Sequence, residues 1–405
     1  TVKFFEISHK MVVDMALVFF ITAALFSFIL AHEDKIRHGY QLFWISLSLA
    51  FLSKGIIGLA IPGIAAGAFV LWQQRYSFLE VFKRAWVIPG VLLVCSVTVL
   101  WAWVLYLRGG MEFIDVFYYY NQFVRFIGTS YRGGHVRPFY YYIPTVFADA
   151  APWSVLMIPA LIKAKLQDDR MKFFLSWFLG GLILLSISST KRGLYFLPMY
   201  PAMAVLIALW IQRIGEKSTP GWERGFMWFA TLLIALCYLI LPVAYVKIGG
   251  TWTAALVVFL LSAGVFLLAA IGFSRNLPYL ACAGWALLLL IWSPVLIPRI
   301  DTLKSYKPFF QEAGKIVNQQ EVIGYQLTET IEALSPFYGE FFSENVTDKD
   351  AFAREISSGD HTFVWVLPSR LDEHLRESIA SKGEMVLEAK SPTLKNIQLW
   401  RLDRN

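Results

Sequence analysis

The chain has 405 residues, of which 57% are hydrophobic and only 16% are charged, and its mean hydropathy is +0.55. A chain this apolar is not an ordinary soluble domain; its composition is typical of a polytopic helical membrane protein. The formal net charge of +7 suits a membrane protein with basic cytoplasmic loops. It does not indicate nucleic-acid binding, because no long basic run is interleaved with aromatic residues.

Hydrophobic segments follow one another along the first three quarters of the chain, and we predict a helical segment for each. They cover residues 11–31, 41–53, 56–72, 86–107, 140–162, 173–189, 194–211, 226–246, 251–273 and 278–296. The second and third segments are short for a membrane span, which needs about 20 apolar residues. The sequence therefore predicts a mainly α fold, with a transmembrane helical bundle of about ten segments over residues 1–298.

A long connection separates the fourth and fifth segments, and we predict an outer loop there, over residues 107–139. Connections of this length are usually functional or disordered, and the many aromatic residues argue against disorder. We interpret the stretch around Arg125 as an amphipathic segment at the membrane surface. The aromatic residues expected on its lipid side are Phe117, Tyr120, Phe123 and Phe126.

The composition becomes that of a soluble domain from about Arg299, and we predict a small α/β accessory domain over residues 299–405. Apolar runs rich in β-branched and aromatic residues predict its strands, and amphipathic runs predict its helices. The expected strands cover residues 321–327, 361–367, 384–390 and 396–402, and the expected helices cover 349–357 and 370–381. No catalytic spacing occurs in this region.

Lysine and arginine are more frequent in cytoplasmic loops than in outer loops. The charge distribution fits best if the first span runs from outside to inside. Asp14, Lys54, the long loop, Lys191 and the C-terminal domain then all lie on the outer side of the membrane.

Two charged residues interrupt the first apolar segments. Asp14 lies within a hydrophobic helix, where a charge costs about 2.5–3.5 kcal/mol, so such carboxylates are functional by default. The alternative is a residue at the helix end that stays hydrated. Lys54, followed by Gly55, breaks two apolar runs, which indicates either a snorkelling lysine or a backbone break aimed at a cavity.

The pair Lys191-Arg192, with Tyr195 one turn later, is the strongest short signal. It precedes a helix, and helix N-termini attract anions, while arginine and lysine side chains suit phosphate. An ordinary basic loop is the alternative, although such loops should be cytoplasmic. His135 and Arg137 lie in the long loop, and a lone histidine is more often structural. Together these residues indicate an anionic lipid headgroup, such as a phosphate, beside an acid–base or metal-binding carboxylate.

Four blocks, in order along the chain, resemble a known family. They read VVDMALVFF, LSKGIIGLAIPG, YNQFVRF followed by HVRPFYYYIPTVFADAAPW, and STKRGLYFLPMYPAMAVLIA. The chain is similar in these blocks to GT-C membrane glycosyltransferases of the protein-mannosyltransferase and lipid A aminoarabinose-transferase type. The resemblance covers essentially the whole chain; no block is specific alone.

The resemblance implies a bacterial inner-membrane enzyme that transfers a sugar from a polyprenyl-phosphate donor on the outer, periplasmic face, with inversion. The acceptor would be lipid A, a protein or a cell-envelope glycan. Asp14 matches a catalytic acidic position of the family. The positions that match donor-phosphate residues are Arg125, Lys191, Arg192 and Tyr195, and we place Lys54 with them. His135 and Arg137 match motif positions and are candidates for acceptor or loop contacts.

Two departures from the family pattern matter. The family's first outer loop, which carries an Asp-Glu type motif, should precede Asp14, so we expect this chain to be part of a longer protein and to lack that catalytic base. Some relatives place a metal-binding histidine where Gln122 stands here, so a divalent cation remains open as a cofactor.

The main rival interpretation is a transporter or flippase of an anionic polyprenyl-phosphate lipid, and a membrane scaffold is a third.

Overall fold

In a computed structural model the chain is described over residues 1–9, 12–124, 136–215, 221–272, 277–318, 320–358, 361–389 and 396–402. It divides into two compact units. The first consists of Thr1–Ala235 and Phe273–Cys282, and the second consists of Leu236–Gly272 and Ala283–Asn405. The first unit holds every site residue predicted from the sequence.

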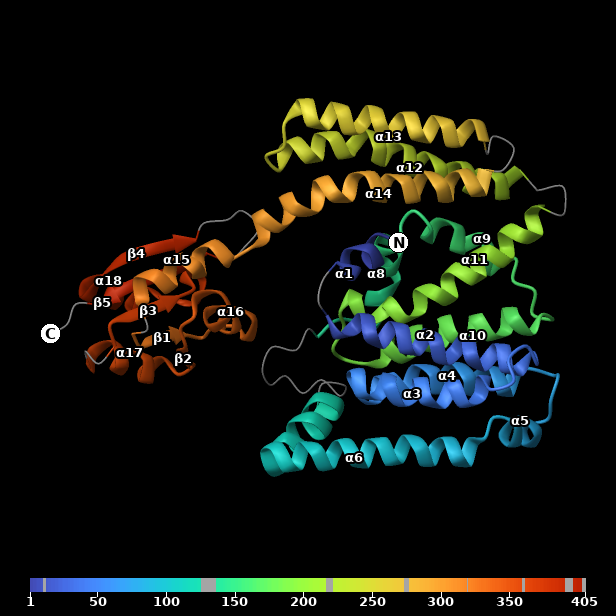
Figure 1. Cartoon of the computed structure of the whole chain (residues 1–405), viewed down its shortest axis with the longest axis horizontal. Coiled ribbons are helices and arrows are strands. Elements are labelled where there is room, and N and C mark those ends of the chain that lie inside the picture. Colours follow the sequence, from blue (N-terminus) through green and yellow to red (C-terminus); the bar gives the residue numbers. More distant parts are fainter. Residues whose placement is uncertain are drawn as a thin grey trace. The chain divides into compact units, whose positions relative to one another are not determined.

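Helices make up almost all of the chain before residue 305 (Figure 1). In order they are α1 (Val2–Ser8), α2 (Val13–His32), α3 (Gly39–Lys54), α4 (Ile56–Trp72), α5 (Phe78–Arg84), α6 (Val87–Ile114), η1 (Asp115–Val124), η2 (Phe139–Tyr141), α8 (Tyr142–Asp149), α9 (Ser154–Ile162), α10 (Asp169–Ile187), η3 (Gly193–Met199), α11 (Tyr200–Gly215), α12 (Gly221–Lys247), α13 (Trp252–Gly272) and α14 (Leu277–Lys304).

The described residues contain six helices that are long and apolar enough to cross a membrane. They are Val13–His32, Val87–Gln122, Asp169–Ile187, Gly193–Arg213, Gly221–Lys247 and Tyr279–Val317. The pair Phe139–Asp149 and Ser154–Ile162, bent by 113°, makes a seventh if it forms one span. The chain is therefore a multi-pass membrane protein. Each predicted hydrophobic segment contains a helix or this bent pair, but α3 and α4 are too short to count as full spans.

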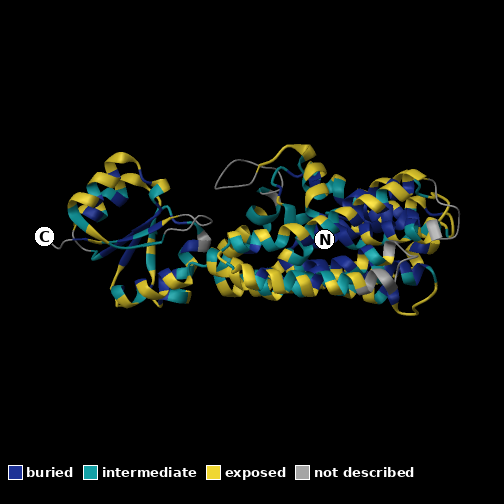
Figure 2. Ribbon diagram, turned by 90° about the horizontal axis from the view of Figure 1, so that it is seen from above, coloured by how far each residue is buried: buried dark blue, intermediate teal, exposed yellow. Residues whose placement is uncertain are grey.

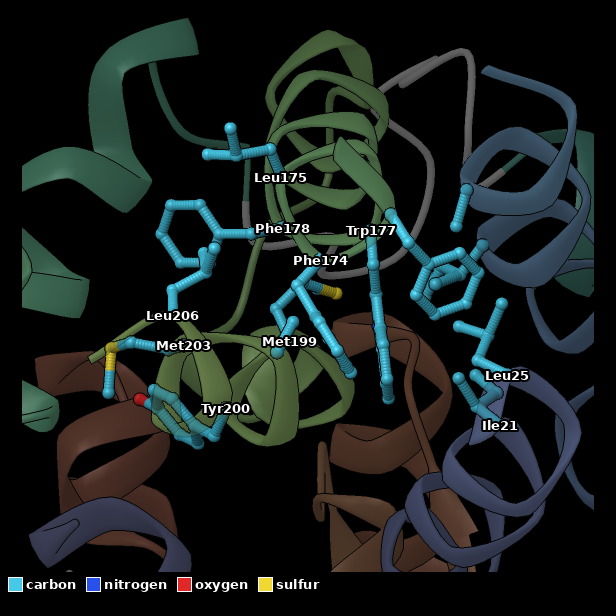
Figure 3. Packing of buried hydrophobic residues seen from close by; sticks show 14 of the residues in the cluster. Ile21, Leu25, Phe174, Leu175, Trp177, Phe178, Met199, Tyr200, Met203 and Leu206 are labelled. Atoms are coloured by element: carbon cyan, nitrogen blue, oxygen red, sulfur yellow. The ribbon is translucent and has the colours of Figure 1, made fainter. Parts of the chain in front are cut away.

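The core of the first unit surrounds α2, which contacts α3, α4, α10 and η3. The Phe28 ring illustrates this centre, since it lies against the rings of Phe43, Phe69 and Phe173 from three other helices. Side chains of α10 fill the space beside α2 and α11, as Figure 3 shows for Trp177. Exposed residues occupy the outer faces of the helices (Figure 2). In a membrane these outer faces are covered by lipid.

Where a loop was expected over residues 107–139, the structure has helix up to Val124. Helix α6 bends at Gly109 and Gly110, and η1 then folds back, so that the Tyr118 hydroxyl donates a hydrogen bond to the Thr98 carbonyl at 3.0 Å. The Phe117 ring is half-buried and lies 6.4 Å from that of Phe51 and 6.1 Å from that of Trp101, and its lipid-side position stays a prediction. Phe123 and Phe126 cannot be placed: the Phe123 side chain and the whole of Phe126 lie outside the description.

The C-terminal region folds as the predicted α/β domain around one five-stranded sheet. Its elements are α15 (Lys307–Val317), β1 (Val322–Tyr325), α16 (Glu329–Leu334), η4 (Ser335–Gly339), β2 (Ser343–Val346), α17 (Lys349–Ser358), β3 (Phe363–Val366), η5 (Pro368–Arg370), α18 (Glu373–Lys382), β4 (Gly383–Ala389) and β5 (Ile397–Leu402). The strand order is β2-β1-β3-β5-β4. Strand β1 is parallel to β2 and β3, whereas β5 is antiparallel to β3 and β4.

Both faces of this sheet are covered by helices. Phe363 and Trp365 of β3 pack in the cluster with α15, while Val364 and Val366 pack in the cluster with α17 and α18. Strands buried on both faces read as continuous apolar runs, which is why β1 and β3 were predictable. Strand β2 was not predicted, because its sequence SENV lies at the sheet edge, remains partly exposed and has no apolar run.

Trp177 tests the packing around α2 and α10. Its indole N–H donates to the Pro198 carbonyl at 3.0 Å, and the side chain is fully buried. We expect Trp177→Phe to lower the free energy of unfolding by about 1–3 kcal/mol, because the buried carbonyl loses its partner. Thermal unfolding of the purified protein in detergent measures this. Trp103→Phe, at a position 58% exposed, should leave the midpoint unchanged; equal midpoints for both variants would contradict the packing described.

Candidate functional site

Asp14 and Lys54, which the sequence singled out separately, form an ion pair. Asp14 lies in the first turn of α2 and is buried, and Lys54 is the last residue of α3. The Lys54 ammonium donates to the Asp14 carboxylate. Each charge compensates the other in a region where an unpaired charge would be costly. The pair therefore fixes the end of α3 against the start of α2.

Tyr195 joins this pair from a third element. The Lys54 ammonium nitrogen lies 4.4 Å from the centroid of the Tyr195 ring, within the range of a cation–π contact. Tyr195 belongs to the short 3₁₀ helix η3, three residues after Arg192. The structure thus brings together Asp14, Lys54 and Tyr195, and it places the segment that carries Lys191 and Arg192 beside them.

The break between α3 and α4 is shaped by Gly55 and Gln122. Gly55 has φ +70°, a conformation that favours glycine. A Cβ atom there would lie 2.3 Å from the Gln122 amide nitrogen, so only glycine permits this close approach. The Gln122 side-chain oxygen accepts a hydrogen bond from the Ile56 N–H, the first residue of α4, at 3.0 Å. Gln122 therefore attaches the end of η1 to the site.

Sequence reasoning missed this function of Gln122. It was noted only as a replacement for a histidine of some relatives, and an amide side chain carries no signal of its backbone partner. Its position matters because Arg125 follows three residues later. Arg125 lies outside the described residues, as do Arg132 and His135, so the predictions for these residues stay predictions.

Lys191 is buried, with its side chain directed at backbone oxygens. Its ammonium donates to the carbonyl of Arg137 at 3.1 Å and also to the carbonyl of Ser188. Burial lowers the pKa of the Lys191 ammonium below its usual range. Among the described residues, two of the three ammonium N–H groups have these carbonyl partners. The third can donate to a further acceptor such as an anion.

A short antiparallel contact holds this region together. Val136 forms an isolated β-bridge with Thr190, and the Arg137 N–H donates to the Ser189 carbonyl at 3.2 Å. The last residues of the long connection are thereby attached to the turn that carries Lys191. The Arg137 guanidinium itself is exposed and lies 5.9 Å from the centroid of the Tyr141 ring. Its backbone, rather than its charge, contacts the site.

The side chain of Arg192 is exposed, whereas its backbone is fixed. Its carbonyl accepts hydrogen bonds from the Tyr142 hydroxyl at 3.3 Å and from the Tyr195 N–H at 3.0 Å. A second carboxylate, Asp149 of α8, lies next to this turn: a Cβ atom on Gly193 would be 2.8 Å from an Asp149 oxygen. Asp149 belongs to the third of the four sequence blocks. It was not predicted as a site residue, because its neighbours are alanines and form no motif with it.

Among the residues that the structure describes, no group of three or more histidine, cysteine, aspartate or glutamate side chains could hold a metal ion. His135 lies outside the described residues. A divalent cation at the site therefore stays a prediction from the sequence.

Comparison with known proteins finds a partial family match and a shared fold. Residues 1–117 match the family described as dolichyl-phosphate-mannose-protein mannosyltransferase. The crystal structure of ArnT from Cupriavidus metallidurans bound to undecaprenyl phosphate superposes with a TM-score of 0.72 at 17% sequence identity, covering 96% of this chain and 74% of that chain. The chain has an ArnT-like fold. The resemblance identified from the four sequence blocks is confirmed.

Curated relatives with sequence similarity include ArnT-type enzymes. The undecaprenyl phosphate-alpha-4-amino-4-deoxy-L-arabinose arabinosyl transferase of Serratia proteamaculans (strain 568) is 28% identical over 51% of this chain and 38% of its own length. An uncharacterized protein of Aquifex aeolicus (strain VF5) is 31% identical over 51% of this chain and 44% of its own length. The matched segments thus span less than half the length of these two relatives.

The Asp14–Lys54 pair is testable by a double-mutant cycle. We expect Lys54→Met to destabilise the protein by about 3–5 kcal/mol, because it leaves a buried carboxylate without a partner. The double variant with Asp14→Asn should regain most of that loss. Thermal unfolding in detergent measures the cycle, with Lys315→Met as control, because Lys315 belongs to an exposed pair with Glu312. Strictly additive losses would show that the two residues do not interact.

The link through Gln122 is testable by hydrogen exchange. We expect Gln122→Ala to accelerate amide exchange in peptides covering the start of α4, because the Ile56 N–H loses its acceptor. The neighbouring variant Asn121→Ala should leave exchange there unchanged. Mass spectrometry of the purified protein reads both. If protection of the Ile56 amide is the same in the Gln122 variant as in the unmodified protein, the side-chain contact does not hold α4.

Proposed function

We propose that this chain is part of an integral-membrane glycosyltransferase that transfers a sugar from a polyprenyl-phosphate donor to an acceptor. The observation that carries the proposal is that Lys54 contacts both the Asp14 carboxylate and the ring of Tyr195, which follows Lys191 and Arg192 in the same short segment at one end of a membrane-embedded bundle. Cations at the border of the membrane suit the phosphate of a lipid donor. The likeness to an ArnT structure bound to undecaprenyl phosphate supports the same ligand.

Each residue takes a definite part in this proposal. Lys191 presents an ammonium group whose charge is desolvated, and an anion beside it relieves that cost. Arg192 adds an exposed guanidinium on the same turn. Lys54 shares its charge between Asp14 and the Tyr195 ring, so it positions these groups and adds to the positive potential. Asp14 is the carboxylate that pairs with Lys54, and the proposed acid–base chemistry begins there.

The charges at the two ends of the bundle support an outer, periplasmic position for the site. The Glu33 carboxylate at the far end of α2 binds Arg170 at the start of α10, so these two termini mark one end of the bundle. The cations near that end are Lys35, Arg37, Arg75, Lys83, Arg84, Lys163, Lys165, Arg170, Lys172, Arg213 and Arg224. Those near the site are Lys3, Lys54, Arg108, Arg137, Lys191 and Arg192. The richer end is expected to face the cytoplasm.

The acceptor is proposed only as a class. Lipid A, a protein and a cell-envelope glycan all offer hydroxyl or phosphate groups at the outer face of the membrane. Curated relatives are named for transfer of 4-amino-4-deoxy-L-arabinose from undecaprenyl phosphate. That donor is the first to test, with a mannosyl donor on the same lipid as the second.

The donor-phosphate assignment predicts a loss of lipid binding. We expect Lys191→Gln and Arg192→Gln each to weaken undecaprenyl phosphate binding roughly 10- to 100-fold, since hydrogen bonds to charged groups contribute about 1.5–3 kcal/mol. Native mass spectrometry of the purified protein measures binding. Lys35→Gln, at the other end of the bundle, is the matched control and should bind as the unmodified protein does. Unchanged affinity in the well-folded Arg192 variant together with the Lys191 variant would overturn the assignment.

Acceptor dependence distinguishes an enzyme from a flippase. With labelled donor in proteoliposomes, a glycosyltransferase releases undecaprenyl phosphate only when an acceptor is supplied. Movement of intact donor between leaflets, without release in the presence of any acceptor class, would favour the transport interpretation.

A further inference from the structure

Two phenylalanine side chains of the C-terminal domain project into solvent. Phe337 is 74% exposed and Phe342 is 83% exposed, and they flank the end of η4, just before the edge strand β2. We call these two residues the aromatic edge. Exposed single hydrophobic residues are common. Two strongly exposed phenylalanines five positions apart are a local concentration of apolar surface.

The aromatic edge is held in a fixed position. Phe341, between the two, is buried, and its ring lies 6.4 Å from that of Phe310 in α15. Gly339 and Gly314 let the backbones of η4 and α15 approach closely, because a Cβ atom on Gly314 would lie 2.1 Å from the Gly339 carbonyl oxygen. The chain therefore anchors one aromatic ring inward and directs its neighbours outward.

The aromatic edge also lies close to the segment that follows the last membrane helix. Helix α14 ends at Lys304 and α15 begins at Lys307. The Lys307 ammonium lies 5.9 Å from the centroid of the Tyr338 ring, and the Tyr338 ring lies 4.8 Å from that of Phe337. Phe337 is thus linked through the Tyr338 ring to Lys307, the first residue of α15, three residues after the end of α14.

The residues around this point have the composition of a membrane interface. Ile300 is an exposed apolar residue on the last turns of α14, and Arg299, Lys304 and Lys307 are exposed cations. Aromatic rings and snorkelling cations are enriched where a span meets the headgroups. Ile300 is the last exposed large hydrophobic residue of α14, and the exposed acids Asp301, Glu340 and Glu344 also lie in these segments.

We propose that the aromatic edge inserts into the interfacial layer of the membrane and holds the C-terminal domain against the bilayer. The occupant is the lipid surface, because Tyr338 links the edge to Lys307, three residues after the end of a membrane span. Insertion removes the two phenyl rings from water without any change in the fold of the domain. This inference goes beyond the proposed function and does not depend on it.

The domain provides its own control position. Met385 is also an exposed large hydrophobic residue, 45% exposed, but it lies on β4. Strands β2 and β4 are the two opposite edges of the five-stranded sheet, about 19 Å apart at the usual spacing between strands. If exposed hydrophobic residues contacted lipid irrespective of their place, Phe337, Phe342 and Met385 would all do so. Insertion of the aromatic edge predicts lipid contact at Phe337 and Phe342 but not at Met385.

Site-directed fluorescence tests the proposal in the full chain. The three native cysteines are replaced by serine, and Phe337→Cys, Phe342→Cys and Met385→Cys are labelled singly with an environment-sensitive nitrobenzoxadiazole dye. The proteins are reconstituted in phosphatidylcholine–phosphatidylglycerol vesicles that contain a headgroup-proximal doxyl lipid. We expect blue-shifted emission and several-fold stronger quenching at positions 337 and 342 than at 385. Equal quenching at all three positions, or none at 337 and 342, would overturn the proposal.

A second variant separates membrane contact from the apolar character of the dye. With the label at position 337, Phe342→Asp should reduce quenching, because a carboxylate at the neighbouring position opposes insertion. Met385→Asp in the same labelled protein should leave quenching unchanged. If the Phe342→Asp variant is quenched as strongly as its parent, the label itself, and not the aromatic edge, reaches the lipid.

Discussion

The ion pair between Asp14 and Lys54 is the interaction on which the site depends. A membrane-embedded bundle tolerates a buried carboxylate only if a cation and hydrogen bonds compensate it. Lys54 reaches Asp14 because α3 ends at that residue and the chain turns at Gly55, whose positive φ favours glycine. Two short helices with a deliberate break therefore replace one continuous span at this point. At the break the first N–H group of α4, that of Ile56, is bonded by the Gln122 side chain instead of by a preceding helical turn.

Every other element of the site is attached to this break. Gln122 of η1 accepts the hydrogen bond of the Ile56 N–H, and Tyr195 of η3 covers the Lys54 ammonium. The bridge between Val136 and Thr190 then fixes the turn that carries Lys191. Elements far apart in the sequence are positioned by these polar contacts in addition to the packing of their apolar side chains. Such a site is specified by a few side chains, and its precision depends on each of them.

The sequence predicted the parts of this arrangement that break a pattern. Asp14 and Lys54 stood out because they interrupt apolar runs, and the structure shows that they interrupt them to reach each other. Gln122 and Asp149 gave no such signal, because a polar residue in a polar stretch is unremarkable until its partner is known. Between residues 107 and 124 the sequence indicated a loop with an amphipathic segment, because the stretch separates two apolar runs; the structure has helix throughout. In the C-terminal domain, buried strands were predictable from apolar runs, whereas the edge strand β2 depends on pairing with β1.

The buried ammonium of Lys191 has a thermodynamic consequence for the whole fold. Because burial lowers its pKa, the folded chain holds this proton less tightly than the unfolded chain does. The resulting cost to stability is fully present below the depressed pKa, and it disappears as the pH rises towards the unfolded-state value. An anion that neutralises the ammonium removes the same cost at neutral pH, and this relief is part of the binding free energy by which the anion stabilises the folded state. Anion binding at Lys191 and the stability of the bundle are therefore linked. The protein without an anion is less stable than the protein with one.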